Sequence, residues 1–185
     1  MSQKKIITIV GAGMMGSAMT IPARDNGHSV RLVGTPLDEH IISRVRRDGY
    51  HPTLKEQLPD GVEFYSVADM AAAMSGADLI IGGVSSFGVD WFSQEVLPLL
   101  QPGQNVLSVT KGLQNYPDGR LGTFPALLAE RLPATLRDRI SFSAIGGPCT
   151  SYELARRRQT MVYFCGEDAA AVASAKEMLA TAYYH

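Results

Sequence analysis

The fold is decided by residues 6–16, which read IITIVGAGMMG. The first five residues are β-branched and almost all apolar, as a strand covered on both faces by helices must be. Glycines then recur in the pattern GxGxxG, and a stretch of helical composition follows from Met14 to Asn26. Strand, glycine loop and helix follow one another directly, and this context gives the glycine pattern a structural meaning.

Each glycine of the loop has an expected role. Gly11 allows the tight turn, Gly13 lets backbone approach a pyrophosphate without a Cβ in the way, and Gly16 lets the helix pack close to the strand. The helix then presents free N–H groups and the positive end of its dipole to the phosphates. We therefore predict that the loop holds NAD or NADP by the pyrophosphate.

The rest of the chain alternates between short apolar runs and helical stretches. The expected strands are 6–10, 29–33, 62–65, 77–84, 105–109, 140–145 and 160–165, and the expected helices are 14–26, 38–48, 67–74, 91–100, 124–131 and 169–181. Residues 50–60, with two prolines, are expected to be irregular. This alternation predicts an α/β fold with a doubly wound, mostly parallel sheet (Rossmann-type) and a single domain over residues 1–185. Its ligands bind where the carboxyl ends of the strands meet.

Composition excludes several classes of partner. A formal net charge of −1 gives no reason to expect nucleic acid or an anionic membrane. Cys149 and Cys165 form neither a CxxC motif nor a metal-ligand spacing, so we expect no metal site and a reducing, cytoplasmic setting. The apolar run at residues 6–10 is too short for a signal sequence or a membrane span.

The end of the second expected strand bears on the choice of cofactor. NAD-selective domains place an acidic residue there for the ribose 2′-hydroxyl, but this chain has Val33-Gly34-Thr35-Pro36, and Asp38 follows only after the proline. We expect Thr35 to contact the ribose or a phosphate, and NADP(H) to bind at least as well as NAD(H). The nearby arginines at 44, 46 and 47 are interpreted as exposed on a helix face, although one of them close to a 2′-phosphate stays an alternative.

Three later segments end strands at the same predicted edge. They are GGVSSF at residues 82–87, VTKGL at 109–113 and IGGPCTSYE at 145–153. Small residues in the first allow backbone to approach a flat ring, so Val84 and Phe87 are expected beside the cofactor. A lysine at the mouth of the crevice, Lys111, is a candidate partner for a phosphate or carboxylate.

These segments together resemble the NAD(P)-dependent glycerol-3-phosphate dehydrogenases, the soluble enzymes that reduce dihydroxyacetone phosphate. The resemblance rests on GAGxxGxA at residues 11–18, SVTKGL at 108–113 and GGPxxxxE at 146–153, and extends over essentially the whole chain. The order and the spacing of the three motifs agree with the family.

The resemblance implies a set of site residues. Implied cofactor-binding residues are Gly11, Gly13, Met14, Met15, Gly16, Thr35, Val84, Phe87, Lys111 and Ser151, and implied substrate-binding residues are Lys111, Gly147 and Cys149. The chain departs from the family where Met15 replaces a common aromatic residue, Cys149 a common serine and Ser151 a common alanine. The side-chain contacts at these positions are therefore the least secure part of the comparison.

The resemblance also implies a second, helical domain that supplies the proton-transferring lysine, and nothing after Thr181 corresponds to it. We therefore expect no catalytic residue within this chain and no turnover by this chain alone. For the full-length protein, the resemblance implies a small phosphorylated substrate and a role in glycerophospholipid metabolism. It also makes the full-length protein a possible homodimer. Two alternatives stay open. One is the cofactor domain of another two-domain reductase, of the 6-phosphogluconate or ketopantoate type, which the Lys111-Gly112 and Gly147-Pro148 pairs disfavour. The other is a stand-alone dinucleotide-binding module.

Overall fold

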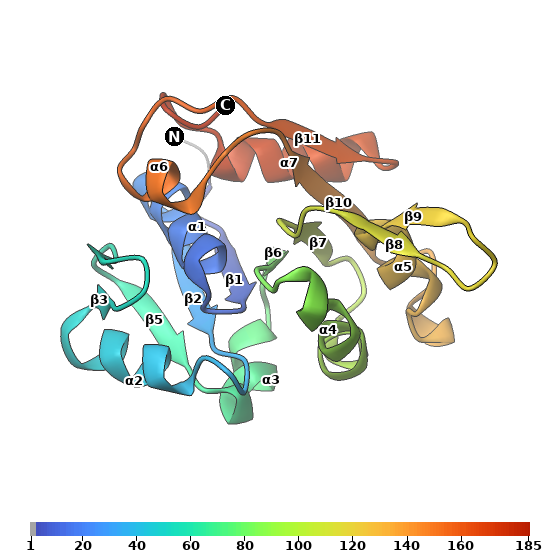
Figure 1. The fold of residues 1–185 in the computed structure, drawn as a ribbon, viewed down its shortest axis with the longest axis horizontal. Helices are drawn as coiled ribbons and strands as arrows, with labels where there is room; N and C mark the ends of the chain where they lie inside the picture. The colour runs from blue at the N-terminus through green and yellow to red at the C-terminus, as the bar shows by residue number, and fades with distance from the viewer. Residues whose placement is uncertain (1–2) are drawn as a thin grey trace.

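The computed structural model describes residues 3–185 and contains a central seven-stranded sheet (Figure 1). The strand order is β11-β10-β7-β6-β1-β2-β5, so the chain passes from β2 and β5 on one side of β1 to β6 and β7 on the other. The strands are β1 (Ile6–Val10), β2 (Ser29–Val33), β5 (Val62–Tyr65), β6 (Leu79–Gly82), β7 (Asn105–Ser108), β10 (Ser141–Gly146) and β11 (Tyr163–Gly166). All pairs except β10 with β11 are parallel, which confirms the doubly wound, mostly parallel fold.

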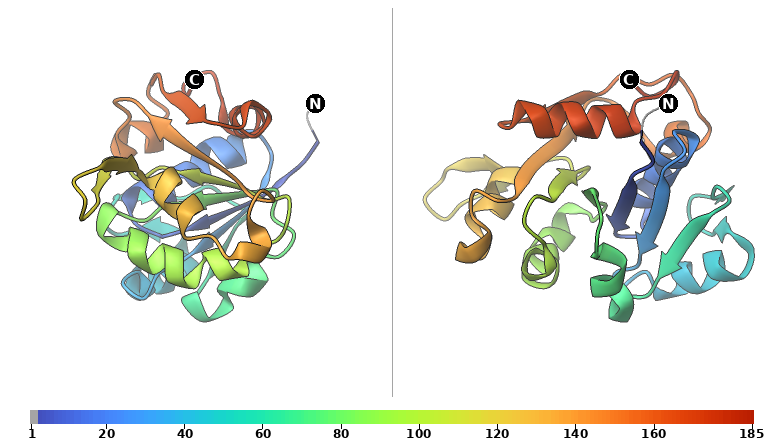
Figure 2. Two further views of the ribbon diagram at one scale, coloured as in Figure 1. Left: turned by 90° about the vertical axis from the view of Figure 1, so that its right-hand side faces the viewer. Right: turned by 180° about the vertical axis from the view of Figure 1, so that it is seen from behind.

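Helices cover both faces of this sheet (Figure 2). One face carries α1 (Met14–Asp25), α2 (Glu39–Asp48), α6 (Ser151–Ala155) and α7 (Ala169–Leu179), and the other carries α3 (Met70–Met74), α4 (Val89–Glu95) and α5 (Phe124–Glu130). Short 3-10 turns are η1 (Val67–Asp69), η2 (Ser86–Gly88), η3 (Leu97–Leu99) and η4 (Ala134–Leu136). Among the described residues, none of these helices is long and apolar enough to cross a bilayer.

The central strand shows why the sheet needs both layers. Ile7 and Ile9 of β1 are fully buried in the core beneath α1, whereas Val10 belongs to the core beneath α3 and α4. The polar Thr8 faces the same side as Val10 and donates from its hydroxyl to the Ala73 carbonyl at 2.6 Å. Alternate residues therefore enter opposite cores, and the nearly continuous apolar run follows from this placement.

Strand β11 does not end at the edge where the carboxyl ends of the parallel strands meet. It pairs antiparallel with β10, with Gly146 opposite Tyr163 and Ser143 opposite Gly166. It also begins later than expected, because Thr160 pairs with Tyr184 near the end of the chain instead. A run of apolar residues identifies a strand but carries no information on its direction, which the pairing with β10 decides.

The structure adds two hairpins and shortens two helices. The stretch expected to be irregular contains β3 (Tyr50–His51) and β4 (Glu56–Gln57), and β8 (Leu113–Asn115) and β9 (Leu121–Thr123) form a second hairpin before α5. Helix α4 ends at Glu95, before Pro98, whose missing N–H cannot continue the helical ladder. The expected helix from residue 67 begins with η1 and becomes α-helical only at Met70.

Candidate functional site

The loop between β1 and α1 lies where the strand order reverses, because β2 and β6 flank β1 on opposite sides. Gly11 has a φ of +113°, and a Cβ there would lie 2.7 Å from the carbonyl carbon of Gly83. A Cβ on Gly16 would lie 2.0 Å from the Gly11 oxygen, and one on Gly83 would lie 2.8 Å from the Cα of Gly16. These three glycines pack against one another and close the loop onto the end of β6.

Gly13 is a glycine for a different reason. Its φ of −66° suits any residue, and a Cβ there would have no atom within 4 Å. Gly13 is also the N-cap of α1 and offers no side-chain cap. Within residues 3–185, the N–H groups of Gly13, Met14 and Met15 have no protein acceptor. Open space in front of unpaired amides at the positive end of a twelve-residue helix fits the pyrophosphate of a dinucleotide.

The expectation that no carboxylate closes the second strand is wrong. The chain turns after β2 and brings back Asp38, whose Oδ2 accepts from the Thr35 N–H at 2.9 Å and from the Thr35 hydroxyl at 2.8 Å. The hydroxyl proton of Thr35 is therefore directed to Asp38 and not toward a ribose or phosphate. The spacing Thr-x-x-Asp is the signal available in the sequence, since an acidic side chain three residues after a threonine can reach back to the threonine N–H.

A second unexpected residue is His51, which lies on the short β3 strand. Its Nε2 lies 2.9 Å from the carbonyl oxygen of Ala12, inside the glycine loop, and the side chain is fully buried. Burial lowers the pKa of His51 below its usual value near 6.5. No local sequence signal connects residue 51 with residue 12, because the contact depends on the fold of the β3–β4 hairpin.

At the end of β6, two glycines are explained by packing within the protein, and Phe87 of the following turn is exposed. Gly83 packs against the glycine loop. Gly82 packs against the Phe92 ring, and a Cβ on Gly82 would lie 3.3 Å from this ring. Room for a flat ligand ring explains neither glycine. Val84 is half-buried, and its carbonyl accepts from the Thr110 hydroxyl at 2.7 Å. Phe87 is 97% exposed on η2, so its ring is free to contact a ligand.

The three residues expected at the substrate meet where β7 and β10 end. The ammonium of Lys111 donates to the carbonyl oxygens of Gly147 and, at 3.1 Å, of Cys149. Burial raises the pKa of the Cys149 thiol, although Lys111 opposes that shift, so the sulfur is protonated near neutral pH. Ser151, expected at the cofactor, is buried at the start of α6, which Thr150 and Glu153 cap reciprocally.

The glycine loop and Lys111 occupy the same edge of the sheet. The Gly83 N–H donates to Val10 at 2.8 Å, and the Val109 N–H donates to Gly82 at 3.2 Å, so the carboxyl ends of β1, β6 and β7 are joined directly. In the part of the chain that the structure describes, no group of three or more histidine, cysteine or carboxylate side chains could hold a metal ion. The edge offers the amides of residues 13–15 and the ammonium of Lys111 as ligands for anions.

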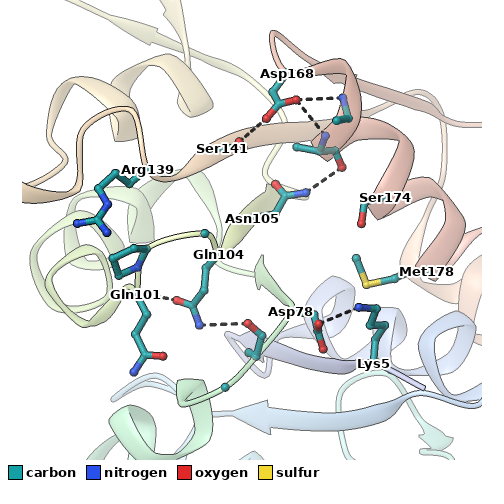
Figure 3. A pocket seen from close by; sticks show the side chains of 16 residues that line it. Lys5, Asp78, Gln101, Gln104, Asn105, Arg139, Ser141, Asp168, Ser174 and Met178 are labelled. Atoms are coloured by element: carbon teal, nitrogen blue, oxygen red, sulfur yellow. Dashed lines mark hydrogen bonds and ion pairs between the residues drawn. The ribbon is translucent and has the colours of Figure 1, made fainter. Parts of the chain in front are cut away.

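A cavity of about 530 Å³ lies at the opposite edge, where the strands begin (Figure 3). Its polar groups bind one another: Lys5 pairs with Asp78 at 3.1 Å, and the Gln104 amide donates to the Met74 and Ala77 carbonyls. Asp168 caps α7 there. Because ligands of open α/β sheets bind at the carboxyl ends of strands, we assign the candidate site to the glycine-loop edge.

Comparisons with known proteins identify the family of this chain. A family model described as the N-terminus of NAD-dependent glycerol-3-phosphate dehydrogenase matches residues 6–172. An NADP(+)-dependent glycerol-3-phosphate dehydrogenase from Archaeoglobus fulgidus is 34% identical over 97% of this chain and 52% of its own length. This chain thus spans about half the length of the curated relatives that it matches.

Solved structures show the same fold. A glycerol-3-phosphate dehydrogenase from Coxiella burnetii matches with a TM-score of 0.79 and 23% identity over 98% of this chain and 53% of its own. A ketopantoate reductase from Ralstonia eutropha matches with a TM-score of 0.55 and 22% identity over 78% of this chain and 42% of its own. The rival reductase families are therefore not favoured. The chain belongs to the NAD-dependent glycerol-3-phosphate dehydrogenase family and corresponds to the N-terminal part of its members.

Proposed function

We propose that this chain binds NAD or NADP and forms the cofactor-binding part of an enzyme that interconverts sn-glycerol 3-phosphate and dihydroxyacetone phosphate. One observation carries the proposal: at the switch point of the sheet, the amides of residues 13–15 have no acceptor among residues 3–185, and a Cβ on Gly13 would meet open space. Family membership supports the choice of reaction.

The residues of the glycine loop would hold the dinucleotide. The pyrophosphate would accept from the N–H groups of Gly13, Met14 and Met15, with the two methionine side chains beside it. Gly11 and Gly16 would shape the loop through the close backbone contacts that they make. Thr35 would meet the adenosine ribose through its oxygen, while Val84 and Phe87 would lie beside the nicotinamide. When bound, the cofactor exchanges a hydride with C2 of the substrate.

Lys111 would bind the phosphorylated substrate. An ammonium group has three donors, and two of them already point to the carbonyls of Gly147 and Cys149. The third donor is available for a phosphate oxygen without any loss of the contacts to the loop. Lys111 would thus bind the anion while it keeps the Gly147–Cys149 segment in place.

The finer assignments are also proposals. The longer protein would work in the cytoplasm, which agrees with the two free cysteines of this chain. As a homodimer it would supply glycerol 3-phosphate for glycerophospholipid synthesis. Ser151 would contact the cofactor from the first turn of α6.

Calorimetric titration with NADPH and with NADH tests the proposal. We expect both to bind, with NADPH at least as tight as NADH, because Asp38 Oδ2 already accepts from Thr35 and Ala12 and so is a poor acceptor for a ribose 2′-hydroxyl. A preference for NADH of about a hundredfold or more, roughly 2.7 kcal/mol, would contradict this expectation.

The variant that tests the position of the pyrophosphate is Gly13→Val. Its side chain would enter the space assigned to the pyrophosphate, so cofactor binding should be lost while the melting temperature stays near that of the wild type. If Gly13→Val folds and binds the cofactor with unchanged affinity, the glycine loop is ruled out as the binding site.

A further inference from the structure

Both backbone polar groups of Ala12 are bound by side chains, two of which are distant in sequence. Ala12 lies between Gly11 and Gly13 and is fully buried. Its N–H donates to Asp38 Oδ2 at 3.0 Å. Its carbonyl accepts from His51 Nε2 at 2.9 Å and from the Ser17 hydroxyl at 3.1 Å.

The protonation state of His51 follows from its second contact. The backbone N–H of Leu54 donates to His51 Nδ1 at 3.0 Å, so Nδ1 must be the acceptor nitrogen and Nε2 carries the proton. The neutral ring therefore donates to the Ala12 carbonyl. The β3–β4 hairpin, fixed by the buried Leu54 and Leu58, delivers this one donor to the glycine loop.

Asp38 joins the loop to the end of β2. Its Oδ2 accepts from the Ala12 N–H and from both the N–H and the hydroxyl of Thr35. One carboxylate oxygen thus fixes the distance between the loop and the residue assigned to the adenosine ribose. The side chain is only 9% exposed, so solvent does not supply these contacts.

We propose that His51 and Asp38 are positioning residues for the dinucleotide. They fix the orientation of the two peptide groups that flank the Ala12 Cα, and hence the direction of the amides at residues 13–15, before any ligand arrives. Glycines on both sides make this segment flexible on its own, and a loop that is already ordered loses less conformational entropy on binding. The proposal rests on the proposed function, because it concerns the same site.

The test compares substitutions at His51 with a substitution at a second buried histidine, His28, as the control. His28 is 1% exposed and accepts from the Lys5 N–H at 3.3 Å, at the edge where the strands begin. His51→Leu removes the donor to Ala12, and His51→Gln retains an amide donor. His28→Leu removes a buried imidazole of equal size that does not contact the glycine loop. The readouts are the dissociation constant for NADPH and the melting temperature.

We expect His51→Leu to weaken NADPH binding about tenfold, the scale of one net hydrogen bond. His51→Gln should stay within about threefold of the wild type, since its amide can still donate to the Ala12 carbonyl. His28→Leu should lower the melting temperature and leave the affinity unchanged. Equal affinities for His51→Leu and the wild type, both folded at the temperature of the titration, would overturn the proposal.

A second readout needs no cofactor. Amide ¹⁵N relaxation in the ligand-free chain should give order parameters near the rigid value of about 0.85 for residues 13–15, and lower values in His51→Leu. Unchanged order parameters would overturn the positioning role even if the wild type bound no cofactor, an outcome that would refute the proposed function separately. If His51→Leu does not fold, Asp38→Ala takes its place, because it removes the acceptor for the Ala12 N–H without added bulk.

Discussion

Gly16 and Gly13 belong to one motif but respond to different constraints. A Cβ on Gly16 would lie 2.0 Å from the Gly11 oxygen, a backbone atom that cannot move aside, whereas a Cβ on Gly13 would be free of contacts. Gly16→Ala should therefore destabilise the fold by about 3 kcal/mol or more, and Gly13→Ala by less than about 1 kcal/mol. Urea unfolding of the two variants measures this difference, and equal stabilities would contradict the packing described here.

Buried histidines make stability depend on pH. Burial lowers the folded-state pKa values of His28 and His51 below 6.5, so the unfolded chain takes up protons more readily than the folded one. Their contribution is fully present above about pH 6.5 and declines as pH falls below that value. Asp25, held by Arg157, and Asp168, held by Ser141, also have lowered pKa values, but they lose their stabilising contacts only near pH 4 and below.

We expect the free energy of unfolding to be smaller at pH 5.5 than at pH 7.5. Urea titrations at both values, repeated on a protein with both His28→Leu and His51→Leu, test the assignment. The double variant should show a weaker dependence over this range. A wild-type chain that is equally stable at both pH values would rule out the two histidines as a source of pH-dependent stability.

At the scale of elements, α7 offers a cap that can be tested. Asp168 accepts from the N–H groups of Ala170 and Ala171, and Ser141 donates to its other oxygen at 2.6 Å. Asp168→Ala should cost about 1 kcal/mol of stability, the usual value of an N-cap. The affinity for NADPH should not change, because this helix begins at the opposite edge from the glycine loop. A change in affinity without a loss of stability would contradict that separation.

Elements whose signal is local are predictable from the sequence. The apolar run of β1 and the glycines after it define the first crossover, and Asp168 stands at the expected start of α7 as its cap. The antiparallel direction of β11 is not predictable, because its pairing with β10 depends on the path of the chain through α6. The β3–β4 hairpin escapes prediction because two-residue strands leave no alternating pattern.

The same limit applies to the site. Gly13 and Lys111 can be identified because strand ends and glycine patterns mark the carboxyl edge of a parallel sheet. The contacts of Asp38 and His51 with Ala12 cannot be predicted, since they span 26 and 39 residues along the chain. The hydroxyl of Thr35 donates to Asp38, a bond that the sequence analysis does not include, while the contact of Thr35 with a ribose or phosphate stays a prediction.

For the molecule as a whole, we predict that this chain binds cofactor but does not turn over dihydroxyacetone phosphate. His51 is bound to Ala12, His28 lies at the far edge, and the Cys149 thiol is protonated and buried. General acid–base catalysis typically contributes about 10²–10⁴-fold, so its loss should leave NADPH oxidation near background. Turnover within about tenfold of a full-length glycerol-3-phosphate dehydrogenase, assayed in parallel, would mean that a catalytic group lies within these residues.

The most direct test of cofactor binding at the glycine loop is an amide NMR titration of this chain with NADPH. We predict that the largest shifts fall on residues 13–15, with smaller ones at the ends of β2, β6 and β7, and none around the cavity lined by Lys5, Asp78 and Asp168. Shifts centred on that cavity, or saturation of the binding with the amides of Gly13, Met14 and Met15 unmoved, would contradict the assignment of the cofactor to the glycine loop.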